Sequence, residues 1–249
     1  MATEVVERQY LYCFFRGSEA ETFSTKGMGE RGDPVTTIHY RDLGAVISNS
    51  PEGEYDSSRR NMLNHTKVLE EVMERHTILP VRFNTISPDR EMLDKLICAR
   101  YDELIGELDR MEGKVEMGLK ALWYEGIIFD EILNEREDIR HLRDSLQGKA
   151  PEKTYYERIK LGELVEEAVR TKRSMDEDMI LTTLSPFAVQ SRANDIFGER
   201  MILNAAFLVE RVHEPEMDAA IRALDAQQTN RVLFRYVGPV PPYNFVNLV

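Results

Sequence analysis

Apolar and aromatic residues gather in short runs at the start of the chain, and these runs predict strands. Residues 10–15 (Tyr-Leu-Tyr-Cys-Phe-Phe) form an uninterrupted apolar run that is typical of a buried strand. A loop rich in glycine follows, up to Pro34. Residues 35–40 and 43–48 then flank only two polar residues, so we expect an antiparallel hairpin with a tight turn.

Helical spacing replaces this pattern after position 56. We expect Asp56 or Ser57 to cap a helix with apolar positions at Met62, Leu69, Val72, Met73 and His76. Residues 77–84 return to a strand, and Pro80 within it favours an edge position or a bulge. Ser87-Pro88 then starts a helix with the apolar stripe Leu93, Leu96, Ile97, Leu104, Ile105, Leu108 and Met111. The first half therefore predicts the order β-β-β-α-β-α.

A second series of elements begins near Glu112-Gly113. Over residues 115–123 the apolar positions Val115, Met117, Leu119, Ala121 and Trp123 alternate with Glu116, Gly118 and Lys120, which indicates a strand with one buried face. Two long helices follow over 126–147 and 155–184, the second ended by Ser185-Pro186. Their expected apolar stripes are Ile128, Ile132, Ile139, Leu142 and Leu146, then Tyr155, Ile159, Leu164, Val165, Ala168, Val169 and Met179.

The remaining pattern predicts strands 187–192 and 201–211, a short helix from Pro215 and a last strand 231–237. The order β-α-α-β-β-α-β is that of a ferredoxin-like fold whose first crossover is enlarged into a helical hairpin, 126–184. A helix of ~22 residues is ~33 Å long and a short strand only ~20 Å, so the hairpin must extend beyond the sheet. We expect its two stripes to bury against each other and its charged faces to remain in water.

The C-terminal segment 238–249 is stiff and apolar, which is unusual for a terminus. Three prolines fix its backbone, and its aromatic and aliphatic residues need a surface to cover. We expect it to pack, as a preset extended segment, on the second sheet, whose open face carries Glu116, Lys120, Gln190, Arg192 and Arg235. The candidate residues for this structural docking are Pro239, Pro241, Pro242, Tyr243, Phe245 and Val246.

Composition agrees with an α+β protein of two domains. The chain has 249 residues and is 42% hydrophobic, enough for a core in each domain. We expect an N-terminal α+β domain over 1–111, a C-terminal ferredoxin-like domain over 112–237 and the tail over 238–249. The net charge of −12 opposes nucleic-acid binding. No apolar run is long enough to span a membrane, and residues 1–8 lack a leader pattern, so we expect a cytoplasmic protein.

No motif in the sequence predicts catalysis or a bound cofactor. Residues 27–32 read Gly-x-Gly-x-x-Gly, but no helix follows the last glycine, so we interpret them as a mobile loop. The five histidines include no pair at i, i+4, and His65 and His76 are too far apart along their helix to share a metal. Cys13 and Cys98 lack metal-type neighbours, and we expect both to be buried thiols. We therefore expect no catalytic residue, metal or cofactor.

Three stretches resemble the gas vesicle protein F/L family (GvpF/GvpL). They are residues 78–83 (Ile-Leu-Pro-Val-Arg-Phe), 155–160 (Tyr-Tyr-Glu-Arg-Ile-Lys) and the ending Gly-Pro-x-Pro-Pro-Tyr-x-Phe-Val. The resemblance implies two α+β domains, no cofactor and no enzymatic activity. It also implies a minor structural or assembly role in the gas vesicle, with the small apolar A-type shell protein and other accessory gas vesicle proteins as partners, and with no lipid membrane involved.

Two other classes of function stay open at this point. A ligand-sensing ferredoxin-like module would need a pocket with converging polar groups. A small cytosolic enzyme would need a titratable pair in a cleft. The sequence shows neither feature.

Overall fold

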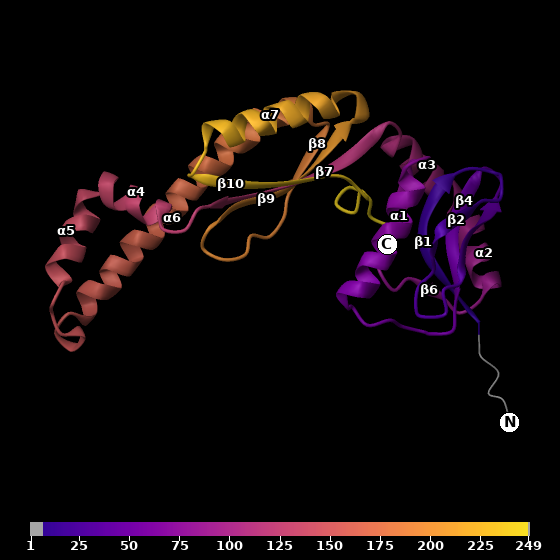
Figure 1. Cartoon of the computed structure of the whole chain (residues 1–249), viewed down its shortest axis with the longest axis horizontal. Helices are drawn as coiled ribbons and strands as arrows, with labels where there is room; N and C mark the ends of the chain where they lie inside the picture. The colour runs from indigo at the N-terminus through magenta and orange to yellow at the C-terminus, as the bar shows by residue number, and fades with distance from the viewer. Residues whose placement is uncertain (1–6, 249) are drawn as a thin grey trace. The chain divides into compact units, whose positions relative to one another are not determined.

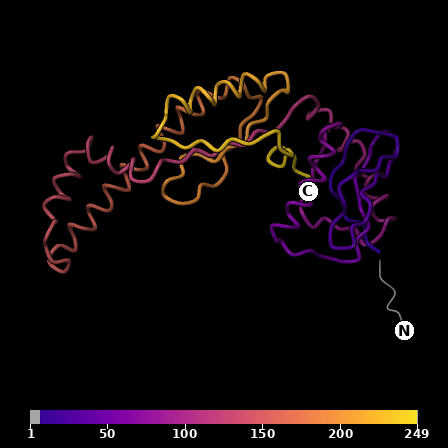
Figure 2. Tube along the Cα trace, in the orientation of Figure 1, coloured from indigo at the N-terminus to yellow at the C-terminus, as the bar shows by residue number. Residues whose placement is uncertain are grey.

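The computed structural model describes residues 7–248, and these form two compact units. Unit 1 comprises the chain up to Glu116 together with the C-terminal segment from Gly238, and unit 2 comprises 117–237. Figure 2 shows the trace of both along the chain. Two expectations fall partly outside the described residues: the lack of a leader pattern in 1–6 and the contribution of Val249 to the tail.

Unit 1 is built on a sheet with the strand order β2-β3-β4-β1-β5, with β6 also paired to β1. Its strands are β1 (Arg8–Arg16), β2 (Thr22–Lys26), β3 (Pro34–Tyr40), β4 (Leu43–Ser50), β5 (Ile78–Pro80) and β6 (Ile86–Ser87). The expected hairpin is confirmed: β3 and β4 are antiparallel and Tyr40 pairs with Leu43. Arg41 in the turn adopts a positive φ of 56°.

A bulge in β1 decides which aromatic side chains share a face of this sheet. Leu11 pairs with Ile47 and Cys13 with Val46, so Tyr12 is an extra residue on β1. The extra residue interrupts the alternation of faces, so Tyr12 and its neighbour Cys13 point to the same face. As a result Tyr10, Tyr12, Cys13 and Phe15 all join one buried cluster, although they do not alternate in sequence.

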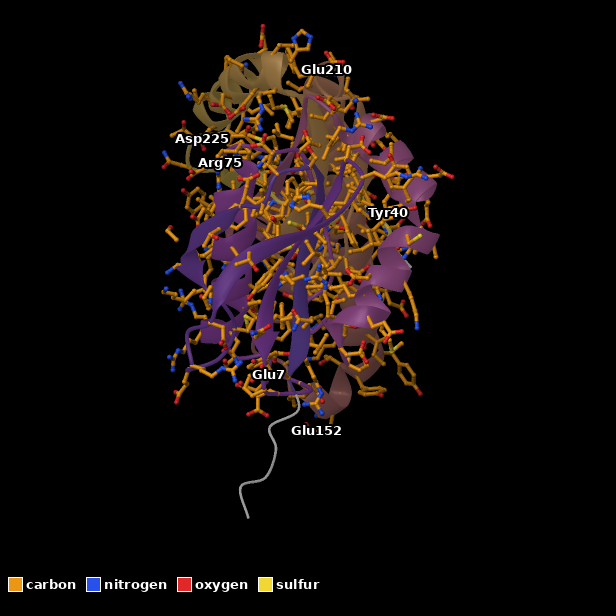
Figure 3. The ribbon with its side chains drawn as sticks, turned by 90° about the vertical axis from the view of Figure 1, so that its right-hand side faces the viewer. Glu7, Tyr40, Arg75, Glu152, Glu210 and Asp225 are labelled. Carbon is orange, nitrogen blue, oxygen red and sulfur yellow. The ribbon has the colours of Figure 1, made fainter. Side chains whose placement is uncertain are left out.

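Helices cover both faces of this sheet, which Figure 1 shows with α1 and α2 on opposite sides of the strands. The helix α1 (Arg59–Met73), capped by Ser58, packs its buried Val68, Leu69 and Val72 against the aromatic cluster. The helices α2 (Arg90–Ala99) and α3 (Tyr101–Met111) pack on the other face. In Figure 3, Arg75 just beyond α1 and Tyr40, whose ring contacts Tyr101 of α3, lie on the two sides of the unit.

Several local expectations for unit 1 are wrong. Strand β2 lies inside the segment expected to be loop, because its Thr- and Ser-rich sequence buries only Phe23 and shows no apolar alternation. The helix expected from Ser87 to Met111 is broken at Arg100, whose φ of −104° and ψ of 12° leave the helical region. Cys13 is buried as expected, but Cys98 is exposed, since it lies on the outer side of α2.

Unit 2 contains a four-stranded sheet in the order β10-β7-β9-β8. The strands are β7 (Lys114–Trp123), β8 (Gln190–Ala193), β9 (Met201–Glu210) and β10 (Val232–Val240). The expected buried face of β7 is confirmed, with Val115, Met117, Leu119, Ala121 and Trp123 all buried. On the expected polar face Lys120, Gln190, Arg192 and Arg235 are exposed, but Glu116 is buried.

The crossover between β7 and β8 is a helical arm formed by α4 (Ile127–Glu135), α5 (Glu137–Leu146) and α6 (Tyr155–Leu184). The expected helix 126–147 is broken at Arg136, which has a φ of −107° and a ψ of 93°. Helix α6 ends where Ser185-Pro186 predicts, and its last turns bury Ile180 and Leu184. Helix α7 (Glu214–Gln227) packs beside α6 (Figure 1).

The two ends of α6 differ in what they bury. Its C-terminal half contacts β9 and α7, while α4 and α5 pack along the rest, beyond the sheet in Figure 1. The expected stripe is only partly correct, because Tyr155 is 61% exposed and Ile159 is 43% exposed. The arm therefore extends past the sheet as the helix lengths predict, and part of its apolar surface has no cover within unit 2.

Candidate functional site

The C-terminal segment folds into one turn of helix instead of the extended conformation we expected. The carbonyl of Pro242 accepts hydrogen bonds from the amides of Phe245 (3.1 Å) and Val246 (3.0 Å). The amide of Tyr243 also donates to the carbonyl of Pro241 (2.8 Å). Proline suits the first position of a helical turn, because its missing N–H has no partner there in any case.

Three polar contacts fix this turn to unit 1. The hydroxyl of Tyr243 lies 2.8 Å from Nε2 of His65 on α1. The guanidinium of Arg110 on α3 donates to the carbonyl of Phe245 at 2.6 Å. The carboxylate of Glu116 accepts from both the backbone amide (2.9 Å) and the side-chain amide (2.6 Å) of Asn244. We call these three unit 1 residues, together with tail residues 241–246, the tail site.

His65 is almost fully buried, and its hydrogen bonds determine its tautomer. The backbone amide of Asn84 donates to the hydroxyl oxygen of Tyr10. The hydroxyl proton of Tyr10 is therefore free to be donated to Nδ1 of His65, 3.0 Å away. In this assignment Nε2 carries the imidazole proton and donates it to Tyr243. Burial lowers the pKa of His65 from 6.5 to about 4, so the ring is neutral at neutral pH. Burial also raises the pKa of Tyr10 and of Tyr243.

The six tail residues chosen from the sequence divide by burial. Pro241, Pro242, Phe245 and Val246 are buried, whereas Pro239 is exposed and Tyr243 is 41% exposed with its hydroxyl turned toward His65. The sequence predicts that the tail packs on the second sheet, but the polar contacts of the tail are with other elements. Pro239 lies within β10 itself, and the polar groups of the tail find their partners on α1, on α3 and at the start of β7.

Sequence reasoning missed the unit 1 side of the tail site. Glu116 sits at a polar position in an alternating strand and looks like a solvent-facing residue. His65 and Arg110 lie on amphipathic helices, where nothing in the spacing marks them. The one available signal was that the polar tail residues Tyr243 and Asn244 needed partners when their apolar neighbours were buried.

A second polar network joins the arm to the sheet inside unit 2. Arg231 forms bidentate hydrogen bonds with Asp176 on α6 (3.0 and 2.9 Å) and with Glu131 on α4 (2.6 and 3.0 Å). The indole of the buried Trp123 donates to Asp176 at 2.7 Å, and Lys172 donates to Glu131 at 3.3 Å. The hydrogen bond from Arg231 lowers the pKa of Glu131. This network holds α4 and α6 at a fixed position on the sheet.

The arm carries two neighbouring hollows. The larger, about 680 Å³, lies between α4, α6 and residues 198–200 of the β8–β9 loop. The smaller, about 180 Å³, is lined almost entirely by apolar side chains of α4, α5 and α6. Phe129 and Val165 line both, so we treat them as one surface and call it the arm groove.

Other candidate features do not converge on chemistry. The glycine-rich residues 27–32 lie beside the start of α1, around hollows of about 510 and 420 Å³ that carry both acidic and basic side chains. Within residues 7–248, no three histidine, cysteine or acidic side chains lie close enough to hold a metal ion. Among the described helices, none combines the length and apolar composition needed to cross a bilayer.

The fold and its sites define a mixed helix-and-sheet protein with two sheets, a tail bound to the first unit and a helical arm on the second. Comparison with known families then gives a specific result. The model of the family described as gas vesicle synthesis protein GvpL/GvpF matches residues 8–247, and the chain belongs to this family.

Individual relatives agree along almost the whole length. Gas vesicle protein F of Dolichospermum flosaquae is 29% identical over 96% of this chain and 97% of its own. Gas vesicle protein F of a Streptomyces species is 32% identical over 88% and 91%. The crystal structure of GvpF from an Anabaena species superposes with a TM-score of 0.84 at 25% identity, covering 98% of this chain and 99% of the other.

Proposed function

We propose that this chain is a minor structural or assembly protein of the gas vesicle that binds the small apolar A-type shell protein and other accessory gas vesicle proteins. The observation that carries the proposal is the family match over residues 8–247, which includes both units and the tail. The surface of the arm supports a binding role, since Phe129, Tyr155 and Tyr156 are 41%, 61% and 80% exposed. In this proposal the protein has no enzymatic activity, uses no cofactor and works in the cytoplasm at the vesicle.

We also infer that unit 2 is a ferredoxin-like domain with an enlarged first crossover. In its sheet β9 separates β7 from β8, and β7 separates β9 from β10. This split pairing is what two interlocked βαβ units produce. The tail residues Pro239, Pro241, Pro242, Tyr243, Phe245 and Val246 then act as a structural element that ties the end of β10 to unit 1.

A capture experiment tests the binding role. The full chain, carrying an affinity tag, is co-expressed with the small shell protein of the same gene cluster and recovered under native conditions. We expect the shell protein to be recovered with it, and not with the tag alone. Failure to recover shell protein, together with normal vesicle formation in cells that lack this chain, would overturn the proposal.

A further inference from the structure

The arm groove has a helical face as its floor. The residues of α6 that line the larger hollow are Gly162, Val165, Glu166, Val169, Arg170 and Arg173. Their spacing of three and one places them on a single side of the helix. With Leu161 of the smaller hollow, this face runs from residue 161 to residue 173, two positions that lie about 18 Å apart along the axis at 1.5 Å per residue. That length matches about three turns of a second helix.

Gly162 leaves the N-terminal end of this floor uncovered. A Cβ atom built at Gly162 has no heavy atom within 4 Å, so the space above it is open. Phe129 on the facing wall is 41% exposed, and Val165 and Val169 are half-buried. The groove therefore presents apolar surface next to a gap that a side chain of a partner can enter.

The groove is lined by more positive than negative side chains, whereas the chain as a whole is negatively charged. The two hollows are lined by four arginines (Arg143, Arg170, Arg173 and Arg200) and two glutamates, whereas the whole chain has a net charge of −12. Arg173 is fixed in place by hydrogen bonds to the carbonyls of Met201 (3.0 Å) and Glu199 (2.9 Å), and it lies over the Trp123 ring. Among the residues that the structure describes, the one ion pair of Arg170 is with the exposed Glu166, at 3.7 Å. The rim thus favours a partner with acidic side chains.

The walls favour a helix over an extended peptide. The groove is bounded by α4, α5 and α6, and on its loop side the carbonyls of Glu199 and Met201 already accept from Arg173. An extended peptide would find few backbone partners here, whereas a helix satisfies its own backbone and needs only side-chain contacts.

We propose that the arm groove binds an amphipathic α-helix of a partner protein, with an apolar face of about three turns flanked by Asp and Glu. The apolar face covers Phe129, Val165 and the gap at Gly162, and the acidic flank meets Arg170 and Arg200. The groove is a binding site in addition to the function proposed above. The inference rests on that function in one respect only, namely that the partner helix belongs to a gas vesicle protein.

The test uses a probe of defined chemistry and a variant that fills the gap. The probe is a fluorescent helical peptide of about 16 residues with leucines on one face and glutamates beside them, and its binding to the full chain is followed by anisotropy. In Gly162→Leu the new side chain occupies the groove, and leucine is also a better helix former than glycine. We expect this variant to keep its melting temperature and to bind the probe about tenfold or more weakly.

The matched control is Gly106→Leu on α3 of unit 1. Gly106 is also an exposed helical glycine with no heavy atom within 4 Å of a built Cβ, so it carries the same change away from the groove. We expect unchanged binding in this control. A second probe with lysines in place of the glutamates should bind at least about tenfold more weakly than the acidic one.

Three results would overturn the proposal: equal binding by Gly162→Leu and the unaltered chain, equal binding of the two probes, or no binding of the acidic probe. Sedimentation that shows dimers for the unaltered chain and monomers for Gly162→Leu would also overturn it, by assigning the groove to a second copy. Capture of the shell protein by Gly162→Leu is measured in parallel. Retained capture with lost probe binding would leave the proposed function intact and assign shell binding to another surface.

Discussion

His65 shows how a single buried side chain connects the first core to the end of the chain. Its ring lies between the hydroxyls of Tyr10 and Tyr243, and it is 2% exposed. In the neutral ring Nδ1 accepts from Tyr10 and Nε2 donates to Tyr243, so both nitrogens are satisfied. A second proton on the ring would leave Nδ1 and the hydroxyl of Tyr10 both needing an acceptor, since that hydroxyl already accepts from Asn84.

This arrangement predicts that the protein loses stability as the pH falls below neutrality. The pKa of His65 is about 4 in the folded chain and 6.5 ordinarily, so between these values the unfolded chain binds more protons. The free energy of unfolding should fall by at most about 1.4 kcal/mol per pH unit in this window, and His65 should contribute nothing above about pH 7. Urea unfolding at about pH 7, 5.5 and 4.5 measures the slope.

Two substitutions separate this effect from general acid unfolding. His65→Gln removes the titrating ring, and we expect it to flatten the slope between about pH 6.5 and 4.5. His141→Gln is the control, because the His141 side chain is 73% exposed on α5. Equal slopes for both variants would contradict the role of His65.

The hydroxyl of Tyr243 gives a second prediction at this scale. Tyr243→Phe keeps the ring but leaves Nε2–H of His65 without its acceptor. We expect a loss of about 1 to 3 kcal/mol in the free energy of unfolding, the usual effect of an unpaired buried polar group. Tyr156→Phe makes the same change at a residue that is 80% exposed, and it should leave stability unaltered. Urea midpoints of the three proteins provide the comparison.

At the scale of single elements, the sequence predicts strands and helices where residues of one kind repeat. Residues 115–121 alternate and lie in β7, and the hairpin around Arg41 follows from the short gap between two apolar runs. The breaks at Arg100 and Arg136 were not predictable, because neither position has the glycine or proline that marks a helix end. Tertiary contacts determine both breaks, because α2 and α3 each pack on the sheet of unit 1, and α4 and α5 each pack on α6.

The arm shows the same limit in its apolar stripe. Helical spacing in 155–184 marks Tyr155 and Ile159 as buried, yet both are exposed, while Asp176 at a polar position is buried by Trp123 and Arg231. Periodicity identifies the helix but not what lies beside it. The same limit explains why the two candidate sites were not predicted. The arm groove and the tail site are both formed by residues that are distant in sequence.

The buried end of α6 determines what a deletion of the arm should do to unit 2. Removing the whole crossover 126–184 also removes Asp176, Ile180 and Leu184, which are buried against the sheet side of unit 2. We expect that deletion to unfold unit 2. Replacing only 136–160 with a short Gly-Ser linker keeps these residues and α4, so we expect the sheet to persist. Near-ultraviolet circular dichroism of Trp123 reports the outcome, and a native signal in the full deletion would contradict it.

At the scale of the whole chain, the sequence passes from unit 1 to unit 2 within β7 and returns after Val237. The two compact units divide between residues 116 and 117 and between 237 and 238, and the tail belongs with unit 1. The reason is chemical: the tail brings a hydroxyl, a carbonyl and an amide that find partners at His65, Arg110 and Glu116. Composition alone shows that such a tail needs a surface but does not show which one.

Truncation after Val237 tests this assignment, because its effect should be confined to unit 1. Losing Phe245 and Val246, which are 7% and 9% exposed, uncovers apolar surface and leaves Glu116 without the two amide hydrogens of Asn244. Full burial of a large apolar side chain is worth roughly 1.5 to 3 kcal/mol, so we expect a loss of several kcal/mol and binding of a hydrophobic dye. Hydrogen exchange should quicken in α1 and α3, while amides of β9 and α7 keep their protection. Faster exchange in β9 and α7 alone would instead assign the tail to the second sheet.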